Sequence, residues 1–138
     1  MNRLVRGVLA VSASTVVILA GTTIPASATE GSPSGAPPEG SIGVWCVSVT
    51  GAKACFGEYG DKVWVKDTKA NGEPAAGTIS DTESDVSWHR ECYNGRGADG
   101  GWVMCDFDVP ENDEGLLWAV NNPFVGAQAS TKIWTTII

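Results

Sequence analysis

The sequence contains a single histidine and only nine basic residues against sixteen acidic ones, for a formal net charge of −7. Binding of DNA or RNA relies on clusters of lysine and arginine that neutralise phosphates, so this shortage of basic residues argues against a nucleic-acid partner. One histidine excludes any site built from two or more imidazoles, and with it most zinc catalysis. At 138 residues, the chain has room for one domain of ordinary size.

The longest apolar stretch lies near the N-terminus. Arg3 and Arg6 precede apolar residues 8–20, and small residues follow, ending in an Ala-Ser-Ala triplet at 26–28. This order is typical of a secretory signal peptide over residues 1–28, and the stretch is too short for a membrane anchor. We therefore expect a secreted, extracellular chain that has no membrane partner once the signal is removed. Its mature net charge is −9, from seven basic and sixteen acidic residues.

The next segment, residues 29–41, is rich in glycine, serine and proline. It has no apolar periodicity and contains Pro33, Pro37 and Pro38. A segment of this composition does not bury enough apolar surface to fold on its own. We expect a flexible extension, which is either a simple stalk or an arm that binds a partner.

Residues 42–138 are expected to form a single all-β domain. No window has a sustained helical period, while glycine, proline and Asn/Asp turns recur every eight to twelve residues, about the spacing seen in sandwiches and barrels. The pattern predicts a compact antiparallel β-sandwich or a barrel-like domain. The expected strands lie at residues 42–49, 54–56, 62–66, 78–80, 86–93, 102–109, 116–120 and 131–138.

The four cysteines, Cys46, Cys55, Cys92 and Cys105, are even in number and fall on predicted strands. In a small secreted domain, disulfides are the default. Of the three possible connectivities we favour Cys46–Cys55 and Cys92–Cys105, because each pair flanks a turn-rich segment and would close one hairpin. The spacing does not match a metal-binding motif.

No catalytic constellation stands out. His89 is isolated on a predicted strand, and no G-x-S-x-G motif is present. We therefore expect a non-enzymatic protein with no cofactor and no metal site. Whether the acidic turn binds calcium stays open; its candidate oxygen ligands are Asp106, Asp108, Glu111, Asp113 and Glu114.

The tryptophans suggest a binding surface. In residues 62–66, the period of two places Trp64 on the face opposite Val63 and Val65, and the same rule places Trp102 opposite the core side of its strand. The strand at 42–49 is apolar on both faces, with Trp45 on one of them. We expect Trp45, Trp64 and Trp102 to form an exposed aromatic surface for a protein or a sugar. The alternative is that loops or lysine stems cover them.

The last predicted strand, residues 131–138, is rich in β-branched residues. An exposed edge of this composition would aggregate unless it were paired inside the domain or offered to a partner. Both outcomes remain open from the sequence.

The stretch at residues 55–72, CFGEYGDKVWVKDTKANG, together with the later cysteine pair, resembles the small secreted disulfide-bonded β proteins of actinobacteria. One group of these is the adaptor subunit of secreted antibacterial umbrella toxin particles. The resemblance implies a protein that joins a lectin subunit to a repeat-containing toxin chain. It also implies that the N-terminal extension, with Pro33, Pro37 and Pro38, docks on the lectin.

Two other functions remain as alternatives. The first is an inhibitor of a secreted hydrolase such as an amylase or a protease. The small disulfide-bonded amylase inhibitors of the same organisms carry a Trp-Arg-Tyr contact motif, and its nearest trace here is Trp88-His89-Arg90. The second is a carbohydrate-binding module that uses the exposed tryptophans.

Overall fold

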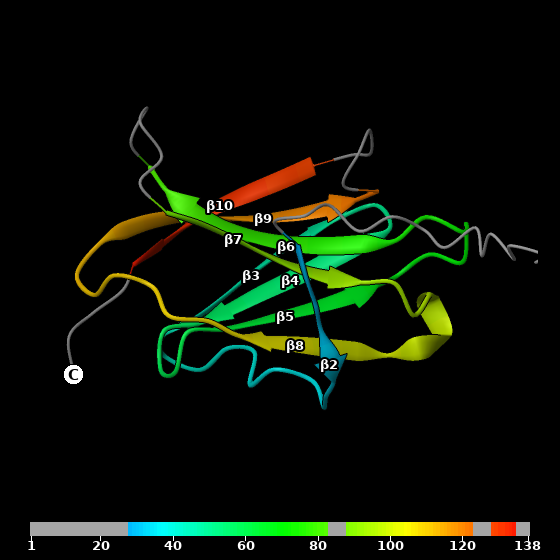
Figure 1. Cartoon of the computed structure of the whole chain (residues 1–138), viewed down its shortest axis with the longest axis horizontal. Coiled ribbons are helices and arrows are strands. Elements are labelled where there is room, and N and C mark those ends of the chain that lie inside the picture. Colours follow the sequence, from blue (N-terminus) through cyan, green and yellow to red (C-terminus); the bar gives the residue numbers. More distant parts are fainter. Residues whose placement is uncertain (1–27, 83–87, 123–127, 135–138) are drawn as a thin grey trace, which may run out of the picture.

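The computed structural model describes residues 28–82, 88–122 and 128–134, and these residues form a β-sandwich rather than a closed barrel (Figure 1). Sheet A has the order β1-β7-β6-β9-β10, and sheet B has the order β2-β8-β5-β4-β3. The strands of sheet A are β1 (Ala28–Glu30), β7 (His89–Asn94), β6 (Ala75–Asp81), β9 (Glu114–Asn121) and β10 (Gln128–Trp134). Those of sheet B are β2 (Ser32–Pro33), β8 (Trp102–Asp106), β5 (Lys62–Asp67), β4 (Ala52–Gly57) and β3 (Val44–Val49). One turn of 3-10 helix, η1 (Ala98–Gly100), lies between β7 and β8.

The all-β prediction is confirmed, and each of the eight expected strands has a counterpart among the described residues. The ends differ by a few residues, and positions 86, 87 and 135–138 of the expected strands lie outside the described residues. Strand β8 is shorter than expected because the backbone amides after it bond elsewhere. The Phe107 N–H donates to the Asp61 carbonyl oxygen at 3.1 Å, and the Val109 N–H donates to Asp61 Oδ2 at 3.2 Å.

The core lies between the two sheets and follows the alternation of each strand. In β5, Val63 and Val65 are fully buried while Trp64 between them is only half-buried, as the period of two requires. Gly77 marks a close approach of the sheets, because a Cβ there would lie 2.8 Å from Val65 Cγ2. The largest apolar side chains that are fully buried in the core are Phe56, Ile79, Leu117, Ile133, Val63, Val65 and Val103.

Both predicted cysteine pairings are confirmed. Cys46 and Cys55 lie directly opposite each other in β3 and β4, so this bridge closes a hairpin as expected. Cys92 and Cys105 lie in β7 and β8, which belong to different sheets. The expectation that the second bridge closes a hairpin is therefore wrong. It fastens sheet A to sheet B through the core, where both cysteines are buried.

The expectation of a flexible extension is wrong for the start of residues 29–41. Strand β1 pairs in parallel with β7, and β2 pairs with β8, so six residues connect the two sheets (Figure 1). Gly31 lies at the crossing, where a Cβ would be 2.7 Å from Val103 Cβ and 3.2 Å from Cys92 Sγ. Pro33 lacks an N–H, and it is tolerated because β2 is an edge strand. The segment folds because two existing sheet edges accept its backbone.

The two sides of the sandwich therefore differ. On one side, β1 and β2 cover the edges of β7 and β8. On the other side, β3 and β10 end their sheets and contact each other across the sandwich. The sandwich is closed on the first side, and its two long edge strands lie on the second.

Candidate functional site

The outer face of sheet B carries two of the three predicted aromatic residues. Trp64 lies opposite Cys55 on one side and Met104 on the other, and both Trp64 and Trp102 are half-buried. The Lys66 Nζ atom lies 5.9 Å from the centre of the Trp102 ring, within the range of a cation–π contact. Both tryptophans lie on the outer face as predicted, but neither is among the strongly exposed residues, and a lysine lies over one of them. The expectation of an exposed aromatic surface here is therefore wrong.

Trp45 does not belong to that surface. It packs against the core cluster, and its ring is stacked on Phe56 with 6.3 Å between ring centroids. The grouping of Trp45 with Trp64 and Trp102 is therefore wrong. Its strand is apolar on both faces, so the alternation itself did not determine which face was buried.

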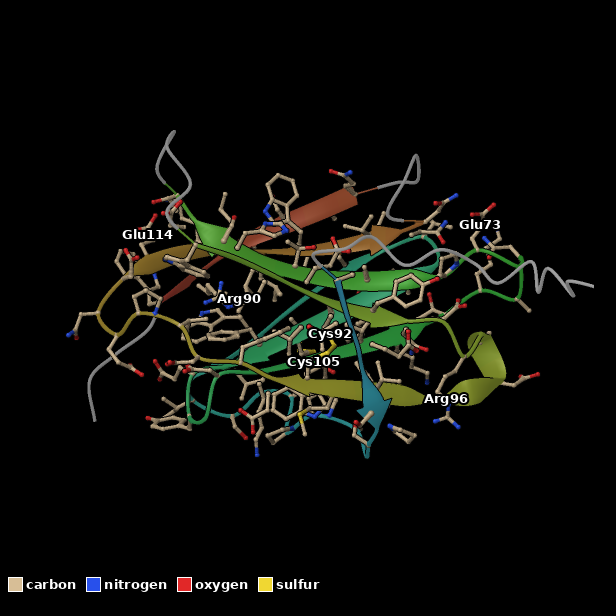
Figure 2. All side chains as sticks on the ribbon, in the orientation of Figure 1. Glu73, Arg90, Cys92, Arg96, Cys105 and Glu114 are labelled. Atoms are coloured by element: carbon tan, nitrogen blue, oxygen red, sulfur yellow. A yellow bond between two sulfur atoms is a disulfide. The ribbon has the colours of Figure 1, made fainter. Side chains whose placement is uncertain are left out.

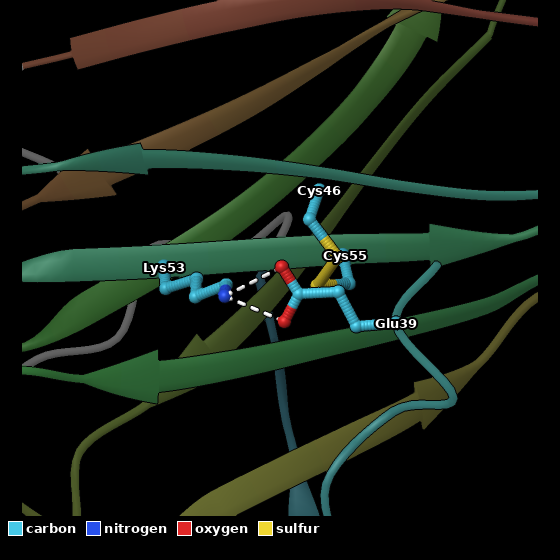
Figure 3. Close-up of polar contacts among 4 residues, drawn as sticks. All are labelled: Glu39, Cys46, Lys53 and Cys55. Atoms are coloured by element: carbon cyan, nitrogen blue, oxygen red, sulfur yellow. Dashed lines mark hydrogen bonds and ion pairs between the residues drawn. A yellow bond between two sulfur atoms is a disulfide. The ribbon is translucent and has the colours of Figure 1, made fainter. Parts of the chain in front are cut away.

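The rest of the proline-rich segment is fixed on the outer face of sheet B. Strands β2 and β3 lie at opposite edges of that sheet, so residues 34–43 must pass from one edge to the other. Glu39 forms a salt bridge with Lys53 of β4, with Nζ–O distances of 2.7 and 2.8 Å, beside the Cys46–Cys55 bridge (Figure 3). Of the three prolines proposed to bind a partner, Pro37 is buried, while Pro33 and Pro38 are exposed. The prolines are held as part of a surface.

The edge of β10 is the second candidate surface. Alternating residues of this strand, Ser130, Lys132 and Trp134, are exposed, and Trp134 retains 54% of its accessible surface. Lys132 forms a salt bridge with Glu114 of β9. Trp134 is one of three large apolar residues of the described chain that are strongly exposed; the others are Ile42 and Tyr59.

All four cysteines are in disulfides, so none of them offers a free thiol. His89 is exposed on β7. Members of the acidic turn have structural partners: Asp113 Oδ2 accepts the indole N–H of Trp88 at 2.9 Å. Within the described ranges, no three His, Cys, Asp or Glu side chains are grouped as a metal site would require.

A hollow of about 500 Å³ lies between the loop before β6 and the loop around η1. Its lining carries side chains of both signs: Glu73 and Arg96, which Figure 2 labels, and also Lys69 and Asp99. Buried Asn94 holds one wall, because its side-chain amide donates to the carbonyl oxygens of Val65 and Gly101 at 3.0 and 3.1 Å. Opposite charges around an open hollow do not select a ligand of either sign.

Asp61 is a buried carboxylate in the turn between β4 and β5. Its Oδ2 accepts the Val109 N–H, while its Oδ1 is buried with no hydrogen-bond partner among the described residues. Burial raises the pKa of Asp61 above its ordinary value of 3.8; the Val109 bond opposes this, and nearby Asp108 and Asp106 add to it. Asp61 also has a left-handed backbone, with φ of 50°.

The substitution Asp61→Asn is expected to stabilise the fold near neutral pH. The pKa of Asp61 is higher in the folded state than its ordinary value of 3.8. The free energy of unfolding therefore falls as the pH rises from about 3.8 through the pKa of the folded state, because the charged form is less favourable in the fold. Asparagine keeps the acceptor for Val109 and tolerates the left-handed backbone. Thermal melts should therefore show a higher Tm for the variant at about pH 7 and a smaller difference at about pH 3.5.

The matched control is Asp61→Ala, which removes both the charge and the acceptor for Val109. It should lower the Tm at both pH values, because the Val109 N–H loses its partner. An equal change in Tm for Asp61→Asn at both pH values would contradict the assignment of a raised pKa to Asp61.

No segment that the structure assigns as helix has the length and apolar character required to span a membrane.

Comparison of the chain with known protein families, with curated proteins and with solved structures gives no match. The function is therefore argued from the chain's own residues.

Sequence reasoning missed two tryptophans on sheet A as site residues, Trp118 and Trp134. A usable signal was present for the first: in Leu117-Trp118-Ala119, alternation places Trp118 opposite two small or aliphatic core residues. Leu117 and Ala119 are fully buried and Trp118 is half-buried, as that alternation requires.

Proposed function

We propose that the chain is a secreted protein-binding module without catalytic activity, and that a partner docks on its β10 edge. The observation that supports this is the exposed edge itself. Strand β10 pairs with β9 on one side, and no strand of the described chain pairs with its other side. An extracellular location is supported by the signal-like N-terminus and by two disulfides, which indicate an oxidising environment.

Strand addition explains how such an edge binds. Unpaired N–H and C=O groups of an edge strand bond to an extended segment of the partner, and alternate side chains provide specificity. On β10 the exposed alternate side chains are Gln128, Ser130, Lys132 and Trp134. Tryptophan is among the residues enriched at the energetic centres of protein interfaces.

The most specific form of the proposal is an adaptor that joins two subunits of a secreted antibacterial toxin particle, one lectin-like and one repeat-containing. An adaptor needs two separate surfaces. One is the β10 edge of sheet A, and the other is the proline segment tied across sheet B by the Glu39–Lys53 salt bridge. In this version the prolines bind as a fixed surface, with Pro33 and Pro38 exposed to the partner.

We predict that Trp134→Ala weakens binding of the partner about 30-fold, the effect of losing an aromatic hot spot. The measurement is titration of the full-length chain, purified with and without the substitution, against the protein that co-purifies with it from culture medium. The fold should be unaffected, because Trp134 is more than half exposed.

The matched control is Tyr59→Ala. Tyr59 is also aromatic and is 53% exposed, but it lies in the turn between β4 and β5 of the other sheet. The Tyr59→Ala variant should bind the partner with the same affinity as the unmodified chain. If both variants bind the partner with unchanged affinity, the β10 edge is not the docking surface.

A further inference from the structure

The outer face of sheet A has a pocket of about 240 Å³, which lies beside strand β10 and does not include Trp134. Residues of four strands line it, namely β6, β7, β9 and, through Gln128, β10. Thr78 of β6 lies opposite Glu91 of β7 on one side and opposite Trp118 of β9 on the other. Ser80 lies opposite His89 in the next outward row, so hydroxyl, carboxylate, imidazole and indole groups line one depression.

Glu91 carries negative charge into this pocket with little compensation from the protein. Its Oε2 accepts only a long hydrogen bond, 3.4 Å, from the Thr78 hydroxyl. Its Oε1 is buried and has no hydrogen-bond partner among the described residues. No lysine or arginine is among the residues that line the pocket. A carboxylate oxygen accepts about two hydrogen bonds, so Oε2, which accepts one long bond from Thr78, has acceptor capacity that a ligand's hydroxyl group would use.

Trp118 adds an apolar surface beside this acceptor. It is half-buried, and it lies directly opposite Thr78 on β6 and Ser130 on β10. An indole ring offers a flat apolar face, while the groups around it form hydrogen bonds. A ligand that fits must therefore have one apolar face and a rim of hydroxyl groups.

A neutral saccharide has this chemistry. The C–H face of a sugar ring is able to stack on an indole such as that of Trp118, and sugar hydroxyls are able to bond to a carboxylate such as Glu91 and to the hydroxyls that line the pocket. An anionic ligand is disfavoured, since Glu91 would repel it and no basic residue lines the pocket to attract it. A lysine from a partner would neutralise Glu91 and contact the indole face, but one ammonium group would not occupy the rest of the polar rim, which includes His89 and Gln128.

We propose that the outer face of sheet A binds a neutral saccharide, with the sugar ring stacked on Trp118 and its hydroxyl groups bonded to Glu91. The site is distinct from the aromatic surface expected on sheet B, because its residues lie on β6, β7, β9 and β10 of the opposite sheet. It adjoins the proposed docking strand, since Gln128 of β10 lines it, but Trp134 is not among its lining residues.

Affinity electrophoresis of the full-length chain tests this, with soluble starch, laminarin, mannan and glycol chitin as the probes in the gel. At least one of the four should retard the chain. Trp118→Ala and Glu91→Gln should each weaken that retardation by about tenfold or more, the loss of one principal contact. Glu91→Gln keeps the shape of the side chain, so its effect separates lost binding from lost folding. The control Trp134→Ala should be retarded like the unmodified chain.

Three results would overturn the proposal. The first is that none of the four polysaccharides retards the chain. The second is that retardation occurs but is unchanged in both Trp118→Ala and Glu91→Gln. The third is that a lysine oligopeptide binds in a Glu91-dependent way while no polysaccharide does, which would assign the pocket to a basic peptide.

Discussion

Replacing Cys92 and Cys105 together with alanine is expected to lower the free energy of unfolding by about 3 kcal/mol, or roughly 15 °C in Tm. The bridge closes a loop with a sequence separation of 13 residues, which is the source of the chain-entropy term. It also joins the two sheets through the core, so its loss removes buried sulfur contacts on both sides. Urea denaturation of the variant and of the parent, both with the Cys46–Cys55 bridge oxidised, gives the difference directly.

The matched control is the double alanine variant of Cys46 and Cys55. That bridge has a sequence separation of 9 residues and connects neighbouring strands that already share a hydrogen-bonded ladder. Cys46 is half-buried on the outer face, so fewer core contacts are lost. The control should be less destabilised than the Cys92/Cys105 variant. Equal or greater destabilisation of the control would show that a bridge between the sheets adds no more to the free energy of unfolding than a bridge between neighbouring strands.

The second large effect is expected for Gly31→Val, with a loss of about 2 kcal/mol from overpacking. A Cβ at this position would be 2.7 Å from Val103 Cβ and 3.2 Å from Cys92 Sγ, so the side chain would force β1 and β2 off the sheet edges. The amide hydrogens of Gly31 and Ser34 donate to the carbonyl oxygens of Tyr93 and Trp102. Both should therefore exchange slowly in the parent and quickly in the variant.

Gly35→Val is the control, because a Cβ at Gly35 has no atom within 4 Å. It should leave stability and the exchange of both amides unchanged. If Gly31→Val were as stable as this control, and if the Gly31 amide exchanged quickly in the parent, the segment would be the free extension that its composition first indicated.

Much of the sandwich is predictable from alternation, and the reason is visible in particular strands. In β5, Val63 and Val65 face the core while Lys62, Trp64 and Lys66 face outward, so one strand reveals both its conformation and its buried face. In β3 both faces are apolar, and the correct assignment of Trp45 depends on contact with Phe56, about ten residues away in the sequence. The alternation of residues along β3 does not reveal the contact between Trp45 and Phe56.

Strands β1 and β2 were missed for a different reason. Their residues have low strand propensity, and a Gly-Ser-Pro sequence normally indicates a loop. They are ordered because β7 and β8 present free edges to them, which is a property of residues some sixty positions further along the chain. The same holds for Cys92–Cys105: the pairing follows from proximity in sequence, but its place between the sheets depends on the strand order.

The candidate sites show the same limit. Alternation is enough to place Trp118 on an outward face, but the row formed by Glu91, Thr78 and Trp118 depends on the register of three strands. Trp134 was part of a predicted strand, and its exposure depends on β10 being the last strand of its sheet. The sequence shows which residue types are present, but strand order and register determine which of them share a surface.

The most direct test of the binding proposal is the mass of the native assembly that contains the chain. Light scattering after size-exclusion chromatography of the untagged protein from culture medium measures this mass. We predict a complex that contains at least one other secreted protein, and an equivalent preparation of Trp134→Ala that elutes without the β10 partner. A chain that elutes as a lone monomer from the same medium would contradict the proposal that this protein is a binding module.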